Sequence, residues 1–236
     1  MFEAVFPFGA LPADDVARLC LTTLRIDPAA RVRLYEKEVN QRAMCREAQR
    51  RQHFDVEVSG YRLEWSGVNN NDLAFLNATG TKEGEPLALV SSLSEKMPLT
   101  TARLYDDEYE HWQNAHDPLQ YDAVGRSMEG LPMKKNDLPP PLDKMIVDTS
   151  RNPGRRILRD GYVEAVGHRM WLGSEFFRRV PGTRRDAIIS ASALKVTELR
   201  EDLLDIVAHD EPFIDSSTAD LQDRLRRLLF PTTAGT

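Results

Sequence analysis

The sequence predicts an α+β protein in which a central, mostly antiparallel sheet is flanked by N-terminal and C-terminal helices. Apolar residues alternate with charged ones over residues 54–65, which is typical of a hairpin with one buried face. Apolar residues recur at helical spacing over 13–25 and over 216–230. The largest apolar mass, residues 162–177, lies between these flanks and is expected at the centre of the sheet.

Length and composition favour a single globular domain. The chain has 236 residues, of which 41% are hydrophobic and 29% charged, and this balance excludes disordered, collagen-like and membrane classes. No signal peptide is recognisable, and no run approaches the roughly 18 apolar residues of a membrane span. We therefore expect one cytoplasmic α+β domain over 1–236. Within it we distinguish a helical N-terminal segment, a β-meander, a proline-rich loop, and a region of central strands with the C-terminal helix, at 1–52, 53–104, 117–142 and 143–230.

Two helices are predicted in the N-terminal segment. Two aspartates follow Pro12 where a helix N-terminus favours negative charge, which places the first helix at 13–25. Asp27 before Pro28 is a typical cap and first-turn pair, and it predicts a second, very polar helix over 27–52.

The hydrophobic period changes to two after these helices. Residues 54–58 and 61–65 form the hairpin, and 73–78 and 87–93 are two more strand candidates. Residues 101–104 add a further strand. Consecutive strands joined by short turns favour an antiparallel meander.

An acidic and aromatic segment follows at 105–112, with four carboxylates and three rings in eight positions. In one interpretation it is a short amphipathic helix whose rings face the core while its acids face water. In the other, part of the aromatic side stays exposed beside the acids and forms a surface for a basic partner. The candidate partner-binding residues are Tyr105, Asp106, Asp107, Glu108, Tyr109, Glu110 and Trp112.

The segment 117–142 contains five prolines and two glycines, which excludes regular structure over most of it. A connection of this length is either a functional loop or a tether across one face.

The stretch 149–177 begins with a turn at Asn152-Pro153-Gly154 and continues into two apolar runs. We expect these runs to form a buried strand pair at the centre of the sheet. Beyond it, the pattern predicts a helix at 187–193, strands at 194–199 and 203–207, a capped helix closed by Pro231, and a frayed tail from Thr232.

No catalytic motif is recognisable in the sequence. The Gly-x-Ser-x-Gly, P-loop and Gly-x-Gly-x-x-Gly patterns are missing. His111 and His116 are five apart, whereas two metal ligands on one helical face need a spacing of four. Cys20 and Cys45 fit no metal spacing and are expected to be free, buried thiols. We therefore expect no enzyme activity, no catalytic residues, no cofactor and no metal.

Charge is distributed unevenly along the chain. Residues 151–185 hold nine arginines against three acids, so this window is +6 and the remainder of a chain of net charge −6 must be −12. This division indicates one basic patch on an acidic body. The acidic body argues against direct nucleic-acid binding and favours a basic protein partner, because opposite potentials accelerate encounter.

With these features, the chain resembles the cytoplasmic immunity proteins that bacteria pair with contact-dependent or type VI secreted toxins. The resemblance rests on an acidic α+β chain of middle size without a catalytic motif. It also rests on the Asn-Pro-Gly-Arg-Arg turn at 152–156, the Gly-Tyr-Val-Glu-Ala-Val-Gly run at 161–167 and the Leu-Arg-Arg-Leu-Leu-Phe-Pro end at 225–231. It implies a protein that neutralises a toxin by binding it, for example a cytosol-acting nuclease.

Three functional hypotheses follow. In the first, the segment 105–112 and the proline-rich loop meet a basic toxin surface and block its substrate path, without membrane contact; pairing of the chain with itself as a homodimer stays open. In the second, the arginine cluster binds a phosphorylated or carboxylated small substrate of an enzyme. In the third, the chain is a structural adaptor of a secretion system.

Overall fold

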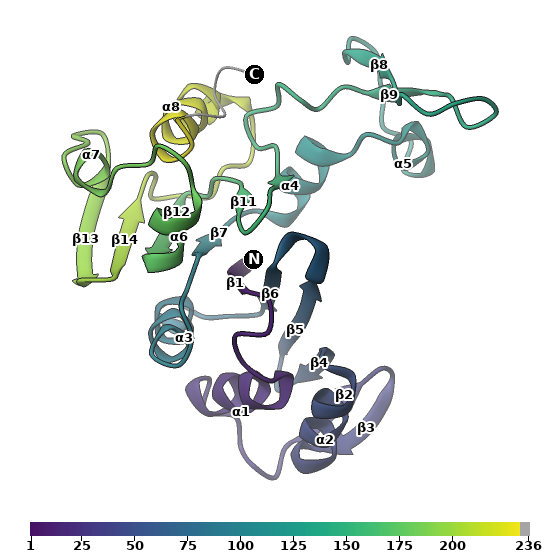
Figure 1. The fold of residues 1–236 in the computed structure, drawn as a ribbon. Helices are drawn as coiled ribbons and strands as arrows, with labels where there is room; N and C mark the ends of the chain where they lie inside the picture. The colour runs from purple at the N-terminus through teal and green to yellow at the C-terminus, as the bar shows by residue number, and fades with distance from the viewer. Residues whose placement is uncertain (232–236) are drawn as a thin grey trace.

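The computed structural model describes residues 1–231 and is built around one ten-stranded sheet whose neighbours are all antiparallel (Figure 1). The predicted α+β class is confirmed. The N-terminal half supplies β1 (Phe2–Pro7), β2 (Arg31–Leu34), β3 (Lys37–Asn40), β4 (Phe54–Val58), β5 (Tyr61–Val68) and β6 (Leu73–Thr79). The C-terminal half supplies β7 (Thr101–Leu104), β12 (Arg169–Gly173), β13 (Lys195–Arg200) and β14 (Leu203–Val207). The order across the sheet is β13-β14-β12-β7-β1-β6-β5-β4-β2-β3.

The remaining elements are helices, two short 3-10 turns and two small two-stranded sheets. The helices are α1 (Ala13–Thr23), α2 (Gln41–Arg51), α3 (Glu85–Ser94), α4 (Asp107–Asn114), α5 (Pro118–Ala123), α6 (Ser174–Arg179), α7 (Arg185–Ile189) and α8 (Ala219–Leu229), and the 3-10 turns are η1 (Asn69–Asn71) and η2 (Ser216–Thr218). The small sheets pair β8 (Met133–Lys135) with β9 (Met145–Val147) and β10 (Ile157–Leu158) with β11 (Val163–Glu164).

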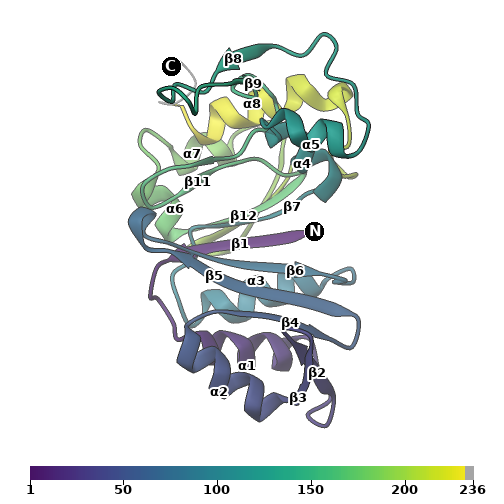
Figure 2. The same cartoon turned by 90° about the vertical axis from the view of Figure 1, so that its right-hand side faces the viewer.

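Helices cover opposite faces of the sheet in its two halves. Helices α1, α2 and α3 pack on the N-terminal strands, whereas α6, α7 and α8 pack on β12 and β14 (Figure 2). Neighbouring residues of β12 show that the faces differ: Trp171 belongs to the first core, while Met170 and Leu172 belong to the second. Since successive side chains of a strand point to opposite faces, one continuous sheet carries core residues on both faces.

The N-terminal strand, and not the apolar stretch 162–177, forms the centre of the sheet. Strand β1 lies between β6 and β7 and joins the two halves. Strand β12 is in the large sheet, but Val163 and Glu164 pair with β10 outside it, which corrects the predicted central strand pair. Residues 161–167 are nonetheless buried, so the apolar run is explained by cover from other elements and not by a place in the sheet.

The predicted second helix over 27–52 is wrong for its first half. A hairpin of β2 and β3 precedes α2, with a turn in which Tyr35 and Glu36 both have positive φ. Val32 and Val39, whose spacing of seven fits one helical stripe, are instead directly opposite across the hairpin. The helix begins only after Asn40, whose side chain caps it by accepting a hydrogen bond from the Ala43 amide at 2.8 Å.

The predicted strand over 87–93 is a helix, α3. Gly84 adopts the left-handed conformation just before it, and Pro86 occupies its first turn. Leu89, Val90 and Leu93 are buried at helical spacing. An apolar run of this length fits a buried helix as well as a strand, and only the packing against α1 and the sheet decides between them.

The other elements agree with the pattern. The hairpin 54–65, the strands at 73–78, 101–104, 194–199 and 203–207, and the helices that begin near residues 13 and 216 are confirmed within a few residues. The helix predicted at 187–193 is α7, which ends at Ile189. Cys20 and Cys45 are free and buried, as expected. The tail expected from Thr232 lies outside the described residues.

Residues 117–147, which we call the arm, project from the body of the molecule (Figure 1). The arm contains α5 and the β8-β9 hairpin, so the proline-rich loop has more regular structure than its composition predicts. Asp117 caps α5 through a hydrogen bond from the Leu119 amide, and Pro118 fits the first turn of that helix.

Candidate partner-binding surface

Helix α4 carries the acidic and aromatic segment and begins directly after β7. Asp106 is its N-cap, because the Asp106 carboxylate accepts a hydrogen bond from the Tyr109 amide at 2.8 Å. Asp106 therefore has a structural role that competes with any role in binding.

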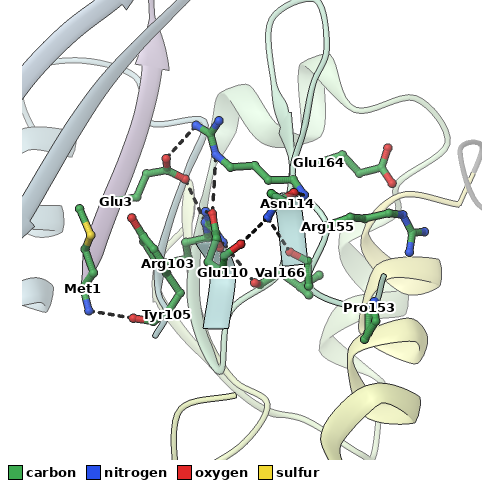
Figure 3. Close-up of polar contacts among 12 residues, drawn as sticks. Met1, Glu3, Arg103, Tyr105, Glu110, Asn114, Pro153, Arg155, Glu164 and Val166 are labelled. Atoms are coloured by element: carbon green, nitrogen blue, oxygen red, sulfur yellow. Dashed lines mark hydrogen bonds and ion pairs between the residues drawn. The ribbon is translucent and has the colours of Figure 1, made fainter. Parts of the chain in front are cut away.

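Glu110 is only partly exposed and belongs to a charge cluster centred on the buried Arg103 of β7 (Figure 3). Both guanidinium end nitrogens of Arg103 donate to the Glu110 carboxylate, and its Nε donates to Glu3 Oε1 at 2.9 Å. Arg156 Nη2 donates to the other Glu3 oxygen at 2.8 Å. Burial alone would raise the pKa of Glu3, but the positive charges and hydrogen bonds of the two arginines outweigh it and hold that pKa below its ordinary value. The cluster ties β1, β7 and α4 to the turn at 152–156.

The three rings of the segment are directed at three different parts of the protein. The Arg103 guanidinium lies over the Tyr105 ring, 4.3 Å from its centroid. The Tyr109 hydroxyl accepts a hydrogen bond from Gln222 Nε2 of α8 at 2.9 Å. Trp112 packs on Tyr121 of the arm, with ring centroids 5.0 Å apart. All three are partly exposed, which lies between the two interpretations of the segment.

Asp107 and Glu108 are the acids of the segment that are exposed to solvent. Asp107 stands at a pocket of about 290 Å³ between α4 and α5, lined also by Tyr105, His111 and Arg156. The seven predicted partner-binding residues therefore divide into groups: two exposed acids, one helix cap, one acid paired with a buried arginine, and three packed rings.

The arginine window 151–185 is not an open basic patch. Eight of its nine arginines have a carboxylate within 4.0 Å, so most of its positive charge is neutralised inside the protein. The partners are Asp223 for Arg155, Glu3 for Arg156, Glu164 for Arg159, Asp205 for Arg169, Glu175 for Arg178 and Arg179, Asp186 for Arg184, and Glu198 for Arg185.

A second buried ion pair anchors α8 to the middle of the chain. Arg226 Nη1 of α8 donates to Glu164 Oε1 at 3.0 Å, and both side chains are almost fully buried. Arg226 also donates to the carbonyls of Pro153 and Arg155, which belong to the Asn-Pro-Gly-Arg-Arg turn. The turn at 152–156 and the apolar run at 161–167 are thus both held against α8 by Arg226.

The arm holds most of the exposed apolar surface, and sequence analysis did not name its residues. Of twelve large hydrophobic side chains that are exposed among the described residues, seven lie in the arm. They are Leu119, Val124, Leu131, Met133, Leu138, Leu142 and Met145. The sequence signal that could have indicated these residues is the leucines and methionines scattered between prolines. Apolar residues in a loop without regular structure are often left exposed, because the loop does not bury them in a core.

The arm has a small core that holds it in place. Ala115, Tyr121 and Val147 are buried together, with Trp112 and Met128 packed against them. The Tyr121 hydroxyl donates to the Ala115 carbonyl at 2.9 Å. The Val147 amide donates to the His116 carbonyl at 2.9 Å, so the two ends of the arm lie side by side. The exposed apolar side chains are therefore presented by an ordered support.

The described part of the chain offers little for metal or membrane chemistry. Within residues 1–231, no group of three or more potential metal-ligating side chains lies close enough to hold an ion. Over the same residues, the helices are too short and too polar for any of them to cross a bilayer.

Comparisons with known proteins find a similar fold in a solved structure. No protein-family model matches the chain, and no curated protein matches it. The chain does share its fold with a protein of the type VI secretion system (T6SS). That protein is the Pseudomonas aeruginosa T6SS protein PA0821, whose structure aligns with a TM-score of 0.50 and 14% sequence identity over 98% of this chain and 71% of that one. At this identity the likeness concerns the fold.

Proposed function

We propose that this protein is an immunity protein of a type VI secretion system, which neutralises a cognate secreted toxin by covering its active site or substrate path. The observation that carries the proposal is the arm, which presents seven apolar side chains to solvent from an ordered support. Large exposed apolar patches mark sites of interaction with other macromolecules, and the arm gathers exposed apolar side chains in one segment. The exposed acids Asp107 and Glu108 belong to α4, the helix that precedes the arm, and suit a basic partner.

The shared fold with a T6SS protein supports the assignment to such a system. The resemblance of the sequence to immunity proteins supports neutralisation as the activity. A nuclease fits as the toxin, because a surface that binds a nucleic-acid backbone is basic and an immunity protein that covers it benefits from acids at the interface.

The test is co-expression with the protein encoded by the reading frame directly upstream. That protein should arrest bacterial growth when expressed alone, and this chain should restore growth and co-purify with it in a fixed ratio. Growth arrest that persists despite stable expression of this chain would contradict the proposal. A complex with a structural component of the secretion machine, without protection, would instead identify an adaptor.

A further inference from the structure

The end of the arm, residues 136–144, is an apolar tip. Leu138 and Leu142 are 51% and 63% exposed, and three consecutive prolines separate them. Each proline fixes its backbone φ, so this short loop has few alternative conformations to lose on binding.

One side chain, Asn136, fixes the shape of the tip. Its amide nitrogen Nδ2 donates to the Leu142 carbonyl at 2.8 Å, and its Oδ1 accepts from the backbone amides of Leu138 and Lys144 at 3.3 and 3.1 Å. The Asn136 backbone amide also donates to the Lys144 carbonyl at 3.0 Å. These bonds close the loop at its base and hold both leucines outward before any partner arrives. Binding by such a loop avoids most of the ordering entropy that a flexible loop loses.

The charges of the tip are unbalanced toward the negative. Asp137 and Asp143 flank the leucines, are exposed, and form no ion pair within the described residues. The basic residue of the tip, Lys144, is already paired with Asp117 at 2.9 Å. A partner that fits this tip therefore needs an apolar cavity for the leucines and cationic side chains at its rim.

We propose that the tip is a preformed anchor that inserts Leu138 and Leu142 into an apolar cleft of the toxin, a cleft whose rim carries lysine or arginine side chains. This inference rests on the proposed function and adds the residues that make the contact and the chemistry of the surface that receives them. A few rigid apolar side chains at the centre of an interface carry most of its binding energy. Asn136 acts as a positioning residue, because it orders the leucines and does not itself face the cleft.

The experiment measures binding by calorimetry between this full-length chain and a catalytically inactivated form of the protein encoded directly upstream. The double variant Leu138→Ala/Leu142→Ala should raise the dissociation constant by at least about tenfold. The control Ile189→Ala removes an exposed apolar side chain of α7, away from the arm, and should leave it unchanged. Wild-type affinity in the double variant overturns the anchor, whereas an unaltered chain that fails to bind overturns the proposed function with it.

A double-mutant cycle tests the role of Asn136. Asn136→Ala alone should weaken binding several-fold, and it should have almost no further effect in the Leu138→Ala/Leu142→Ala background, because ordering matters only when the leucines are present. Fully additive effects would show that Asn136 acts independently of the leucines.

The salt dependence and the oligomeric state complete the test. Asp137→Asn/Asp143→Asn should slow association and make it less sensitive to salt, as expected for a basic rim. The alternative is that a second copy of this chain binds the tip, and light scattering of the purified chain tests this by measuring its oligomeric state. A dimer that the leucine substitutions dissociate would overturn the toxin cleft as the receiver of the tip.

Discussion

The acids of this protein differ in role according to their burial, although the sequence shows them side by side. Glu110 is paired with a buried arginine, whereas Asp107 and Glu108, three and two positions before it, are exposed. A buried ion pair adds little when it is complete, but removing one member leaves the other charge without a partner. Arg103 is the extreme case because its side chain is itself buried and holds two carboxylates at once.

We expect Arg103→Met to lower the free energy of unfolding by about 3–5 kcal/mol, since the buried Glu3 would keep only Arg156 as a cationic partner and Glu110 would lose its closest one. Urea denaturation followed by tryptophan fluorescence measures it. The control Arg62→Met breaks an exposed pair with Asp55 and should cost about 1 kcal/mol or less. Equal losses of unfolding free energy in the two variants would show that the buried cluster contributes no more to stability than an exposed ion pair.

The stability should depend on pH through His168. Burial lowers the pKa of this imidazole to about 4 from its ordinary 6.5. Between these values the unfolded chain binds a proton that the folded chain does not, so the unfolding free energy should fall as pH falls from 6.5 toward 4. Urea titrations at several pH values measure this slope, which His168→Gln should flatten. The variant His116→Gln, which removes an exposed imidazole, is the control; a wild-type slope in His168→Gln would contradict the assignment.

The contribution of Glu3 to stability changes at a lower pH than that of His168. Because its pKa is held below the ordinary 4.5, the stability that it contributes is complete above that value and is lost as pH falls through the folded pKa. The two groups can therefore be separated by the pH at which stability declines.

At the scale of elements, α4 combines a structural side and a free side. Its cap and its inner carboxylate hold the helix against β7, while its exposed acids project outward. A substitution of all four acids together would therefore mix loss of stability with loss of binding.

We expect Asp107→Asn/Glu108→Gln to leave the fold intact but to slow association with the toxin and weaken its dependence on salt, because long-range attraction accelerates encounter. Stopped-flow association rates at several ionic strengths measure it. Asp106→Ala is the matched comparison, since it removes a helix cap and should instead cost about 1 kcal/mol of stability. An unchanged association rate in the double variant would exclude these acids from the interface.

At the scale of the whole molecule, the N-terminal strand joins the two halves while the arm stands apart. Strand β1 pairs on both sides, and its Glu3 reaches the buried charge cluster. The arm starts and ends at adjacent backbone positions, so the body closes without it.

We expect that replacing residues 118–146 by a short glycine-serine linker leaves a folded protein with almost the same urea midpoint but abolishes toxin binding and protection. Circular dichroism and the co-expression assay measure the two effects. Deleting residues 1–7 is the contrasting variant and should prevent folding, because it removes the central strand. An arm-less protein that still protects would locate the interface elsewhere.

Much of the fold follows from local patterns. The alternation over 54–65 determines a hairpin because one of its faces must be buried, and the leucine stripe of α8 determines an amphipathic helix in the same way. Local patterns do not predict the element where the same spacing of apolar residues fits two kinds of secondary structure. Val32 and Val39 fit a helix or a hairpin, and residues 87–93 fit a strand or a buried helix.

By itself, the sequence determined the class of the fold, most of its elements, and an acidic, aromatic segment next to a proline-rich loop. Only the tertiary structure decided that β1 is the centre of the sheet, that the arginines of 151–185 are mostly paired, and that Glu110 is paired with the buried Arg103. The physical reason is that ion pairs and strand pairing join residues as far apart in the sequence as Glu3 and Arg156. The periodicity of apolar residues within one element carries no information about such contacts. The sequence does not show whether a carboxylate faces an arginine or water. Its role depends on its environment, which is determined by the fold of the complete chain.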